Sequence, residues 1–286
     1  MDISDPSFDQ DAWLNRIGYR GSRAPTLETL RGLVDAHAMA ISYESIDVLL
    51  DRPPQLDIQS LQAKMIARRR GGYCFEQNFL FRAGLRSLGF DVTSLQARVV
   101  RGLAIDATRP MLHMVLQVNL PEGPYLADVG FGNVAPTAPL RLASDLEQDT
   151  PHEVMRFVRV GDELALQSRV GAEWMHIYRV VFLPRLDSEY EMCNWFTASH
   201  PKSLHRSNLI VARPGPGRTR VTLFNAQLTV RHVDGEVERR MLESPSDYRE
   251  VLRDSFALDL SDAELELALD TVARKGVRGT PHPFFA

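Results

Sequence analysis

The sequence predicts an α+β fold: a helical N-terminal part, a central antiparallel sheet curled into a barrel, and a mixed α/β C-terminal part. Two observations predict it. Apolar residues recur every three or four positions over the first ninety residues, as in amphipathic helices. Between about 90 and 200 they instead form short alternating or β-branched runs separated by turn residues. Strand-like runs and helical patterns follow to the end.

Three helical regions are expected in the first ninety residues. One covers TLETLRGLVDAHAMAIS (26–42), where the apolar positions have helical spacing. Asp57 can cap a second helix. A third is expected to begin near Tyr73 and to end at Gly89, because glycine suits the left-handed conformation that follows many helices.

The middle of the chain is expected to form antiparallel strands. The segment NLPEGP (119–124) is typical of a hairpin loop, and turns at Gly161-Asp162 and Gly171-Ala172 predict further hairpins. The first three predicted strands are DVTSLQARVV (91–100), HMVLQV (113–118) and YLADVGF (125–131).

The C-terminal part is expected to contain two strand-like runs and two helices. RPGPG (213–217) predicts a break or a tight loop before them. Ser261 and Glu264 have the spacing of a capping box at the start of the last helix, which Gly276 is expected to end. The strand-like runs are RVTLFNAQLTVRHV (220–233) and EVERRML (236–242).

The composition excludes several classes of protein. Of 286 residues, 44% are hydrophobic and 24% charged, as in globular proteins with a buried core. The net charge of −4, with acids and bases mixed, argues against a nucleic-acid partner. No apolar stretch approaches the ~18 residues of a membrane span, and the acidic N-terminus does not resemble a signal peptide. We therefore expect a cytoplasmic protein with no membrane partner.

The chain has two cysteines, and one of them lies where catalytic chemistry is expected. In RRRGGYCFEQN (68–78), Cys74 follows three arginines and two glycines at the start of the third helix. A helix N-terminus stabilises negative charge by ~0.3–1 kcal/mol. The arginines are expected to add to this effect and favour the reactive thiolate. The glycines leave the sulfur open to substrate, and the Cys74 N–H can serve in an oxyanion hole.

Two structural roles for this cysteine are the alternatives. Cys74 can be a small buried core residue, which is common for free cysteine. A disulfide between Cys74 and Cys193 is less favoured, because two cysteines without a CxxC pair or an export signal fit a reducing compartment.

A catalytic cysteine needs a base, and His113 is the best candidate among the eight histidines. It opens one predicted strand, and Asp128 is an unexpected acid in the next. If the hairpin pairs Val118 with Tyr125, His113 and Asp128 share one face with Cα atoms ~7–8 Å apart. The carboxylate can then orient the imidazole toward Cys74. A slip of one residue would place the two on opposite faces.

Other roles for these residues remain open. His113 can be a core histidine bonded to a carbonyl, and Asp128 can bond to its own turn. Cys74, His113 and Asp128 can also bind zinc, but three ligands without a second Cys or His pair are a weak metal signal, so no metal is expected. The residues alone favour a thiol-nucleophile enzyme. The rivals are a cysteine hydrolase and a non-catalytic ligand-binding barrel.

Together these segments resemble the arylamine N-acetyltransferase family. RRGGYCFEQN is similar to the cysteine motif R-G-G-x-C-x-E-x-N of that family, and LHMVLQV and LADVGFG resemble its histidine and aspartate segments in the same order. SHPKSLHRSNLIVAR (199–213) resembles its later motif S-x-P-x-S-x-F-x-x-N-L. The likeness runs from about residue 30 to 225.

The resemblance implies a division of the chain into three parts. Residues 1–90 are expected to form a helical bundle that carries the nucleophile, and residues 91–205 a β-barrel that carries the histidine and aspartate. Residues 206–286 are expected to form an α/β lid. The first two parts together are implied to have a cysteine-protease-like core.

The resemblance also implies an activity. It is acetyl transfer from acetyl-CoA to aromatic amines or hydrazines, by a ping-pong mechanism through an acetyl-cysteine. Cys74 is implied as the nucleophile, His113 as the base and later the acid, and Asp128 as the orienting carboxylate. The oligomeric state is left open.

Residues for the acceptor and for the coenzyme follow from the same resemblance. Phe131 matches an aromatic residue of the acceptor pocket. Tyr43 stands where the family has a pocket phenylalanine, Ser45 where it has asparagine, and His205 where it usually has phenylalanine. The acceptor pocket is therefore expected to be more polar than is usual in the family.

Gly130 and Gly132 match glycines along the path of the coenzyme. Because coenzyme A carries phosphates, basic residues are also expected to line that path, and Arg98, Arg101 and Arg109 are candidates. The chain has no Walker loop and no G-x-G-x-x-G motif, so a nucleotide-binding fold is not indicated.

Overall fold

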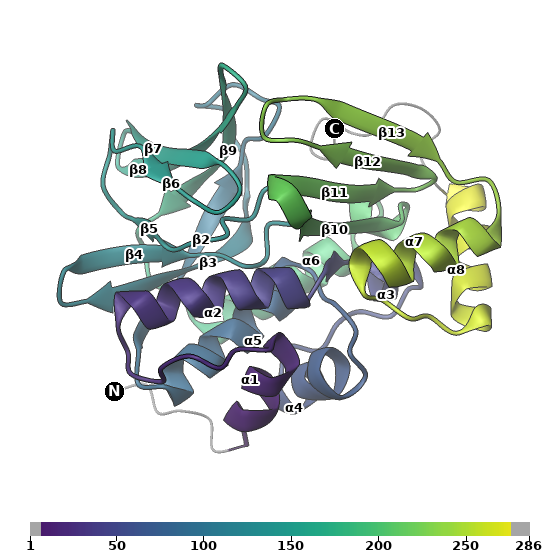
Figure 1. Ribbon diagram of the computed structural model, residues 1–286, viewed down its shortest axis with the longest axis horizontal. Helices are drawn as coiled ribbons and strands as arrows, with labels where there is room; N and C mark the ends of the chain where they lie inside the picture. The colour runs from purple at the N-terminus through teal and green to yellow at the C-terminus, as the bar shows by residue number, and fades with distance from the viewer. Residues whose placement is uncertain (1–6, 276–286) are drawn as a thin grey trace.

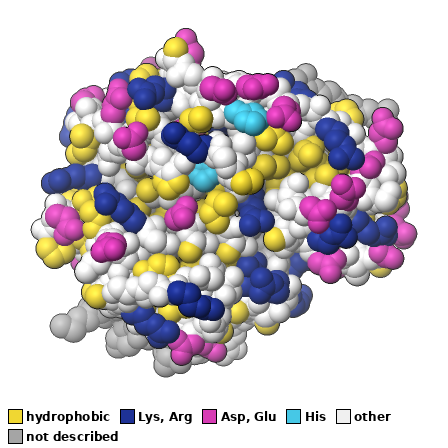
Figure 2. All heavy atoms as spheres, viewed as in Figure 1, with side chains coloured by type: hydrophobic (Ala, Val, Ile, Leu, Met, Phe, Trp, Pro, Cys, Tyr) yellow, Lys and Arg dark blue, Asp and Glu magenta, His cyan; other side chains and the backbone are white. Residues whose placement is uncertain are grey.

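A layer of N-terminal helices and two antiparallel sheets make up the computed structural model, which describes residues 7–275. In Figure 1 the first helices lie below an eight-stranded barrel, and a five-stranded sheet lies beside that barrel. On the face drawn in Figure 2, basic and acidic side chains are interspersed. The predicted α+β arrangement is confirmed.

The helices of the N-terminal part begin and end near the expected residues. The Thr26 side chain accepts from the N–H of Thr29, and the Asp57 carboxylate accepts from the N–H of Ser60 at 2.9 Å. Gly89 has φ +83°, the left-handed conformation predicted for it. The helices are α1 (Gln10–Ile17), α2 (Leu27–Ala40), α3 (Ile46–Leu49), α4 (Ile58–Leu61), which continues as the π-helix η1 (Gln62–Ala67), and α5 (Cys74–Ser87).

Helix α5 is the central element, because it is buried along most of its length. On one side it packs on α1, where a Cβ at Gly84 would lie 2.6 Å from the Trp13 ring. On the other side it contacts the barrel. The nucleophile candidate at the start of α5 is therefore held between two packed layers.

The barrel has the strand order β5-β4-β3-β2-β9-β8-β7-β6. Arg141 of β5 and Gln148 of β6 exchange two hydrogen bonds, of 2.7 and 3.0 Å, so the barrel is nearly closed. Its strands are β2 (Asp91–Val99), β3 (Met111–Leu120), β4 (Gly123–Ala127), β5 (Leu140–Arg141), β6 (Gln148–Asp149), β7 (Val154–Val160), β8 (Glu163–Val170) and β9 (Glu173–Val181).

The predicted hairpins of the barrel are confirmed. Val118 pairs with Tyr125 across the β3–β4 hairpin, in the expected register. The later hairpins turn at Gly161-Asp162 and Gly171-Ala172, also as expected.

Two features of this region differ from the prediction. The third predicted strand ends at Ala127, so Asp128 begins a loop instead of continuing the ladder. The pattern also gave no sign of helix α6 (Asp187–Ser199). Its outward face carries Met192 and Trp195, which are 71% and 68% exposed, so the helix lacks a clear contrast between an apolar and a polar side.

The second sheet has the order β1-β10-β11-β12-β13, and helices α7 and α8 cover one of its faces through a shared apolar cluster. Only the last two residues of RPGPG lie in a tight turn, because the preceding strand continues to Gly215. The Ser261–Glu264 capping box is confirmed, whereas Gly276 lies outside the described residues. The elements are β1 (Tyr43–Glu44), β10 (Ile210–Gly215), β11 (Thr219–Phe224), β12 (Gln227–Arg231), β13 (Val237–Met241), α7 (Pro245–Phe256) and α8 (Asp262–Lys275).

Strand β1 joins the N-terminal and C-terminal parts of the chain, because it pairs with β10. The division into residues 1–90, 91–205 and 206–286 stays a prediction. Over residues 7–275, every helix is too short or too polar to cross a bilayer. The cytoplasmic location also stays a prediction.

Candidate active site

The structure brings His113 and Asp128 together. Nε2 of His113 lies 2.7 Å from Oδ2 of Asp128, and the two residues are 2% and 0% exposed. Because Asp128 occupies Nε2, Nδ1 is the ring nitrogen left for another partner. Cys74 lies close by, since the N–H of Met114, the residue after His113, acts on its thiol. Within residues 7–275 no group of three or more His, Cys, Asp and Glu side chains is arranged to hold a metal ion.

Asn78 connects these residues, and the sequence analysis assigned it no role. It lies one helical turn after Cys74 on α5. Its amide nitrogen donates to the Met114 carbonyl at 2.8 Å and to Oδ1 of Asp128 at 3.0 Å. Its oxygen accepts from the N–H of Val129 at 3.2 Å. The available signal was its position in the cysteine motif, on the same helix face as Cys74.

Asp128 is held as a carboxylate by three hydrogen bonds. Burial by itself would raise its pKa, but the charge and hydrogen bond of His113 act against burial. Further hydrogen bonds come from Asn78 and from the N–H of Gly130 at 2.9 Å. The outcome is a pKa below the ordinary value of an aspartate. The carboxylate can therefore orient His113 and stabilise its protonated form.

The thiol of Cys74 differs from the prediction. Cys74 is 7% exposed, and burial raises its pKa above the ordinary value; the negative charge of Asp128 raises it further. The N–H groups of Phe75 and Met114 act in the opposite direction but are weaker. The arginines do not supply the expected stabilisation of the thiolate. Arg70 is paired with Glu44 at 2.9 Å, and Arg68 and Arg69 are exposed. The structure thus favours the neutral thiol.

The turn before Cys74 requires its two glycines. A Cβ at Gly71 would lie 2.2 Å from the Ser42 carbonyl oxygen, and one at Gly72 would lie 2.9 Å from Cβ of Glu76. The Gly72 carbonyl accepts from the N–H of Glu44 at 3.1 Å. The two glycines thus allow a close backbone approach that a side chain would prevent, whereas Cys74, whose thiol they were expected to leave open, is only 7% exposed.

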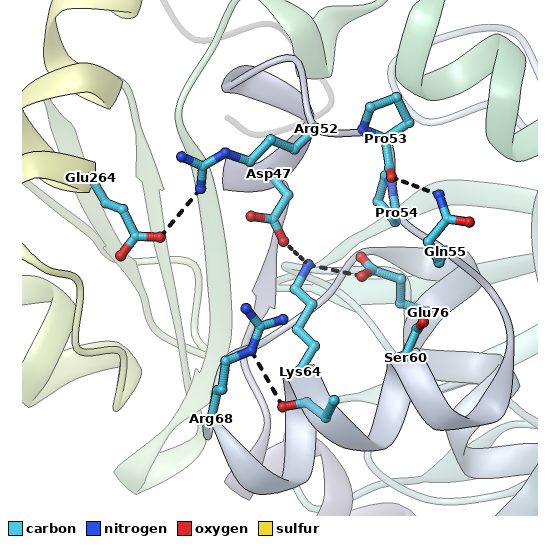
Figure 3. Close-up of a pocket in the computed structure, with 11 residues that line it drawn as sticks. Asp47, Arg52, Pro53, Pro54, Gln55, Ser60, Lys64, Arg68, Glu76 and Glu264 are labelled. Carbon is cyan, nitrogen blue, oxygen red and sulfur yellow. Dashed lines mark hydrogen bonds and ion pairs between the residues drawn. The ribbon is translucent and has the colours of Figure 1, made fainter.

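A network of charged side chains is joined to this turn through Glu76 (Figure 3). Lys64 lies 2.6 Å from Asp47 and 2.8 Å from Glu76, the two contacts drawn at its ammonium group. Glu76 also accepts from the N–H of Tyr73 at 3.0 Å, so it links the first turn of α5 to the network. The network borders a cavity of about 310 Å³, whose lining does not include Cys74. Because acids and bases are paired there, we assign it a structural role.

Aromatic rings surround His113. The Phe131 ring centroid lies 4.9 Å and the Tyr178 centroid 5.1 Å from that of His113, and the two rings are 5.0 Å from each other. Tyr178 belongs to β9 and was not predicted. Its hydroxyl lies near Asp128, and burial followed by the charge of Asp128 raises the pKa of Tyr178 well above the ordinary value. A hydrogen bond of normal geometry is not formed, however.

Tyr43 and His205 form a second aromatic group, with ring centroids 6.4 Å apart. Tyr43 forms a β-bridge with Gly72, two residues before Cys74, and burial, and next the charge of Cys74, raise the pKa of its phenol. Burial lowers the pKa of His205 to about 4, so His205 is neutral at pH 7. Its Nδ1 finds no hydrogen-bond partner in the described part of the chain.

The two glycines predicted along the coenzyme path lie in the loop after Asp128. A Cβ at Gly130 would be 2.8 Å from the Cys74 carbonyl oxygen and 2.7 Å from the Asn78 amide nitrogen. Gly132 has φ +77°, and a Cβ there would be 3.4 Å from the Tyr43 ring. The predicted site residues thus lie in one region, but their roles in binding stay predictions.

Similarity to known proteins agrees with this geometry. A family profile described as N-acetyltransferase matches residues 26–265. The arylamine N-acetyltransferase of Escherichia coli (strain K12) is 39% identical over 268 residues, which cover 94% of this chain and 95% of that protein. The chain belongs to the arylamine N-acetyltransferase family. As a member of this family it is an acyltransferase, as the motifs predicted.

Solved structures of arylamine N-acetyltransferases have the same fold. That of Mycobacterium marinum is 38% identical, with a TM-score of 0.87 over 92% of this chain and 99% of that one. The same values hold for the M. marinum arylamine N-acetyltransferase in complex with CoA. The Salmonella typhimurium structure is 35% identical and has a TM-score of 0.85 over 91% of this chain and 97% of that one.

Proposed function

We propose that this protein transfers an acetyl group from acetyl-CoA to the nitrogen of arylamines or arylhydrazines, through an acetyl-Cys74 intermediate. The observation that carries the proposal is the 2.7 Å contact between His113 and Asp128 beside the buried Cys74 thiol. The names of the relatives and the M. marinum complex with CoA support the donor and acceptor classes. The proposed catalytic residues are Cys74, His113 and Asp128.

In the first half-reaction, Cys74 attacks the carbonyl carbon of the thioester. Because the structure favours the neutral thiol, Nδ1 of His113 takes the thiol proton as the bond from sulfur to carbon forms. The bond between that carbon and the sulfur of coenzyme A then breaks, and coenzyme A leaves as a thiol with the proton from His113. Exchange of one thioester for another is nearly thermoneutral, which suits cysteine as the nucleophile.

In the second half-reaction, the amine nitrogen attacks the acetyl carbon on Cys74. His113 accepts the proton lost by nitrogen and returns it to the departing Cys74 sulfur, which restores the starting thiol. Asp128 keeps the imidazole oriented through Nε2 during both steps. Aromatic amines are neutral at pH 7, so they arrive as nucleophiles.

The rings near His113 give the acceptor a place to bind. Phe131 and Tyr178 present aromatic faces and edges beside the imidazole, where an aryl ring can stack. Tyr43 and the neutral His205 add polar atoms near Cys74, so we expect acceptors with a polar ring substituent to be favoured. The burial of Cys74 limits access of water and so favours transfer over hydrolysis.

The mass of the intact protein after mixing with acetyl-CoA tests this proposal. We expect the wild type to gain one acetyl group and Cys74→Ser to gain none. Cys193→Ser is the matched control, because it removes the other thiol and should still be acetylated. Addition of an arylamine should discharge the acetyl group as the acetylated amine.

Three outcomes would contradict the proposal. Absence of an adduct on the wild type would exclude acetyl-CoA as the donor. An adduct that persists in Cys74→Ser would exclude Cys74 as the nucleophile. An adduct lost equally fast with and without amine would identify a hydrolase.

A further inference from the structure

Strand β11 of the five-stranded sheet is buried on both faces, and one of these faces carries polar side chains. Across β11 and β12, Arg220 pairs with Arg231 and Thr222 pairs with Thr229. Directly opposite residues share a face, as do residues two apart on one strand, so these four side chains lie on the same side of the sheet. All four are less than 10% exposed. Intervening residues such as Val221 point to the other side and join the apolar cluster under α7 and α8.

The pairing of Arg220 with Arg231 places two like charges directly opposite each other, which is unfavourable by itself. They share one carboxylate, that of Glu153, which is 2% exposed. Nη2 of Arg220 lies 2.6 Å from Oε2 of Glu153, whereas Nη2 of Arg231 lies 3.8 Å from Oε1. Ser168 also donates to Oε1, at 3.4 Å. Glu153 is therefore engaged mainly by Arg220.

Donor capacity remains on both arginines. Nη1 of Arg220 and Nη2 of Arg231 are buried and have no hydrogen-bond partner within residues 7–275. A third guanidinium, that of Arg101, is 3% exposed; burial, and next the charge of Arg231, lower its pKa to about 10. His152 adds no negative charge. Burying Nη1 of Arg220 and Nη2 of Arg231 without a hydrogen-bond partner among the described residues is costly, and an anion bound between these two side chains would remove that cost.

The arginine pair lies on the sheet face that leads to the nucleophile. Tyr43 of β1 pairs with Ala212 of β10, and Ala212 pairs with Thr222 of β11, so these residues share the polar face. Tyr43 also forms a β-bridge with Gly72, two residues before Cys74. Arg220 is two strands and two residues away from Tyr43. The strand spacing and the rise per residue give a distance of about 12 Å between their Cα atoms.

We propose that Arg220 and Arg231, with Arg101 beside them, bind a phosphate of the coenzyme A donor. This inference rests on the proposed function, because it takes acetyl-CoA as the donor. The reacting thioester must lie at Cys74, and the pantetheine arm separates it from the phosphates, so an anion site removed from the nucleophile but on the same face fits the ligand. Guanidinium groups bind phosphate through two parallel hydrogen bonds. Thr222 and Thr229 lie on the same face, each two residues from one of the arginines and in the row of paired residues that includes Tyr43.

Arg98, another arginine considered for this role, is less suited to it. Arg98 is paired with Glu163 at 3.0 Å and donates to the carbonyl of Arg109 at 2.6 Å. Two of its three guanidinium nitrogens are therefore engaged by the protein, whereas Nη2 of Arg231 has no hydrogen-bond partner in the described residues.

The test compares two acetyl donors on Arg231→Gln. The donors are acetyl-CoA and S-acetylpantetheine, which has the same thioester and arm but no nucleotide. We expect Arg231→Gln to lower the second-order rate constant for acetylation of Cys74 by acetyl-CoA at least tenfold, the effect of losing a charge-assisted hydrogen bond. With S-acetylpantetheine the rate should equal that of the wild type, which also shows that the variant is folded.

Arg240→Gln is the matched control. Arg240 lies on β13 of the same sheet, opposite Leu228 on the apolar side, and pairs with Asp247 at 3.1 Å near the surface. The variant changes the net charge equally, so it should react with both donors at the wild-type rates.

The affinity for coenzyme A itself, measured by calorimetry, tests the phosphate site independently of turnover. Arg231→Gln should bind coenzyme A at least tenfold more weakly than the wild type. Equal affinity for coenzyme A, or an equal loss of rate with both donors, would overturn the phosphate site. If the wild type binds coenzyme A through Arg231 but forms no acetyl-enzyme, the proposed function fails while the phosphate site stands.

Discussion

The amide of Asn78 donates a 3.0 Å hydrogen bond to the carboxylate of Asp128, across fifty residues of sequence. Through this contact the helix that begins at Cys74 is joined to the loop that orients His113. The same amide also bonds to the carbonyl of Met114 on β3. One buried side chain thus connects the three elements that carry the proposed triad.

Replacement of Asn78 by alanine should therefore affect both stability and rate. It removes one partner from the Met114 carbonyl, the Asp128 carboxylate and the Val129 N–H. Asp128 keeps its hydrogen bonds to His113 and Gly130, and a buried polar group that is left with no partner costs about 1–3 kcal/mol. We expect the free energy of unfolding in urea to fall by about 2–4 kcal/mol, with slower acetylation of Cys74. Asn119→Ala, which removes a surface hydrogen bond to Asp91, should cost less than about 1 kcal/mol. Equal losses in the two variants would argue against the connecting role.

Asp128→Asn should slow the reaction with little change in fold. The side chain keeps its shape, but an amide can present an N–H to Nε2 of His113 and so favour the wrong tautomer. We expect acetylation of Cys74 to slow by about 10²- to 10⁴-fold, measured by rapid-quench mass spectrometry. A rate within a factor of two of the wild type would show that His113 does not depend on this carboxylate.

Gly130→Ala tests how closely the loop after Asp128 must pack on the nucleophile. The new Cβ would lie 2.8 Å from the Cys74 carbonyl oxygen and 2.9 Å from its Cα, and backbone atoms cannot rotate away. We expect a loss of about 1–3 kcal/mol in unfolding free energy and a rate at least tenfold lower, because the loop must shift. Gly161→Ala is a control of another kind, because Gly161 has φ +60°, at which alanine is strained, but its Cβ would meet nothing within 4 Å, whereas Gly130 does not have a positive φ. The control should lose a similar amount of stability and keep its rate.

Arg70→Met tests the charged network behind the nucleophile turn. Glu44 is fully buried and pairs with Arg70 at 2.9 Å, whereas Lys64 is 4.0 Å away. Removing one member of a buried ion pair leaves an uncompensated charge, so the free energy of unfolding should fall by about 3–5 kcal/mol. Arg68→Met, at an exposed position, should change it by no more than about 0.5 kcal/mol. A loss below 1 kcal/mol for Arg70→Met would mean that other groups neutralise Glu44.

His37 should make the protein less stable in mild acid. It is buried, accepts from the Trp13 indole N–H and contacts Gln77, and burial lowers its pKa to about 4 from an ordinary value of 6.5. Between these values the unfolded chain binds a proton that the folded protein does not, so stability present above pH 6.5 is lost as the pH falls toward 4.

Urea unfolding at several pH values measures this contribution of His37, which can reach about 3 kcal/mol at pH 4. His37→Gln should show a shallower fall in unfolding free energy over the same interval than the wild type. Identical slopes in the two proteins would assign the acid sensitivity to other groups.

Sequence reasoning predicted much of the local structure correctly. The start of α5 at Cys74, its end before Gly89 and the pairing of Val118 with Tyr125 follow from signals a few residues long. The extension of a strand through Asp128 was wrong, because the carboxylate bonds to His113 and Asn78 instead of continuing the ladder. Such contacts depend on residues far away in the chain.

By itself, the sequence determined most of the elements, although not helix α6, and the hairpin register, because periodicity, capping and turn residues act locally. Its distinctive motifs also predicted the set of Cys74, His113 and Asp128. Only the tertiary structure decided the preference of Cys74 for the thiol, since burial and the charge of Asp128 outweigh the helix N-terminus. It also decided that Arg220 and Arg231 lie opposite each other on a buried face around one carboxylate. The free energy of a charged group depends on its burial and on its contacts with residues far away in the sequence, and a local sequence pattern encodes neither.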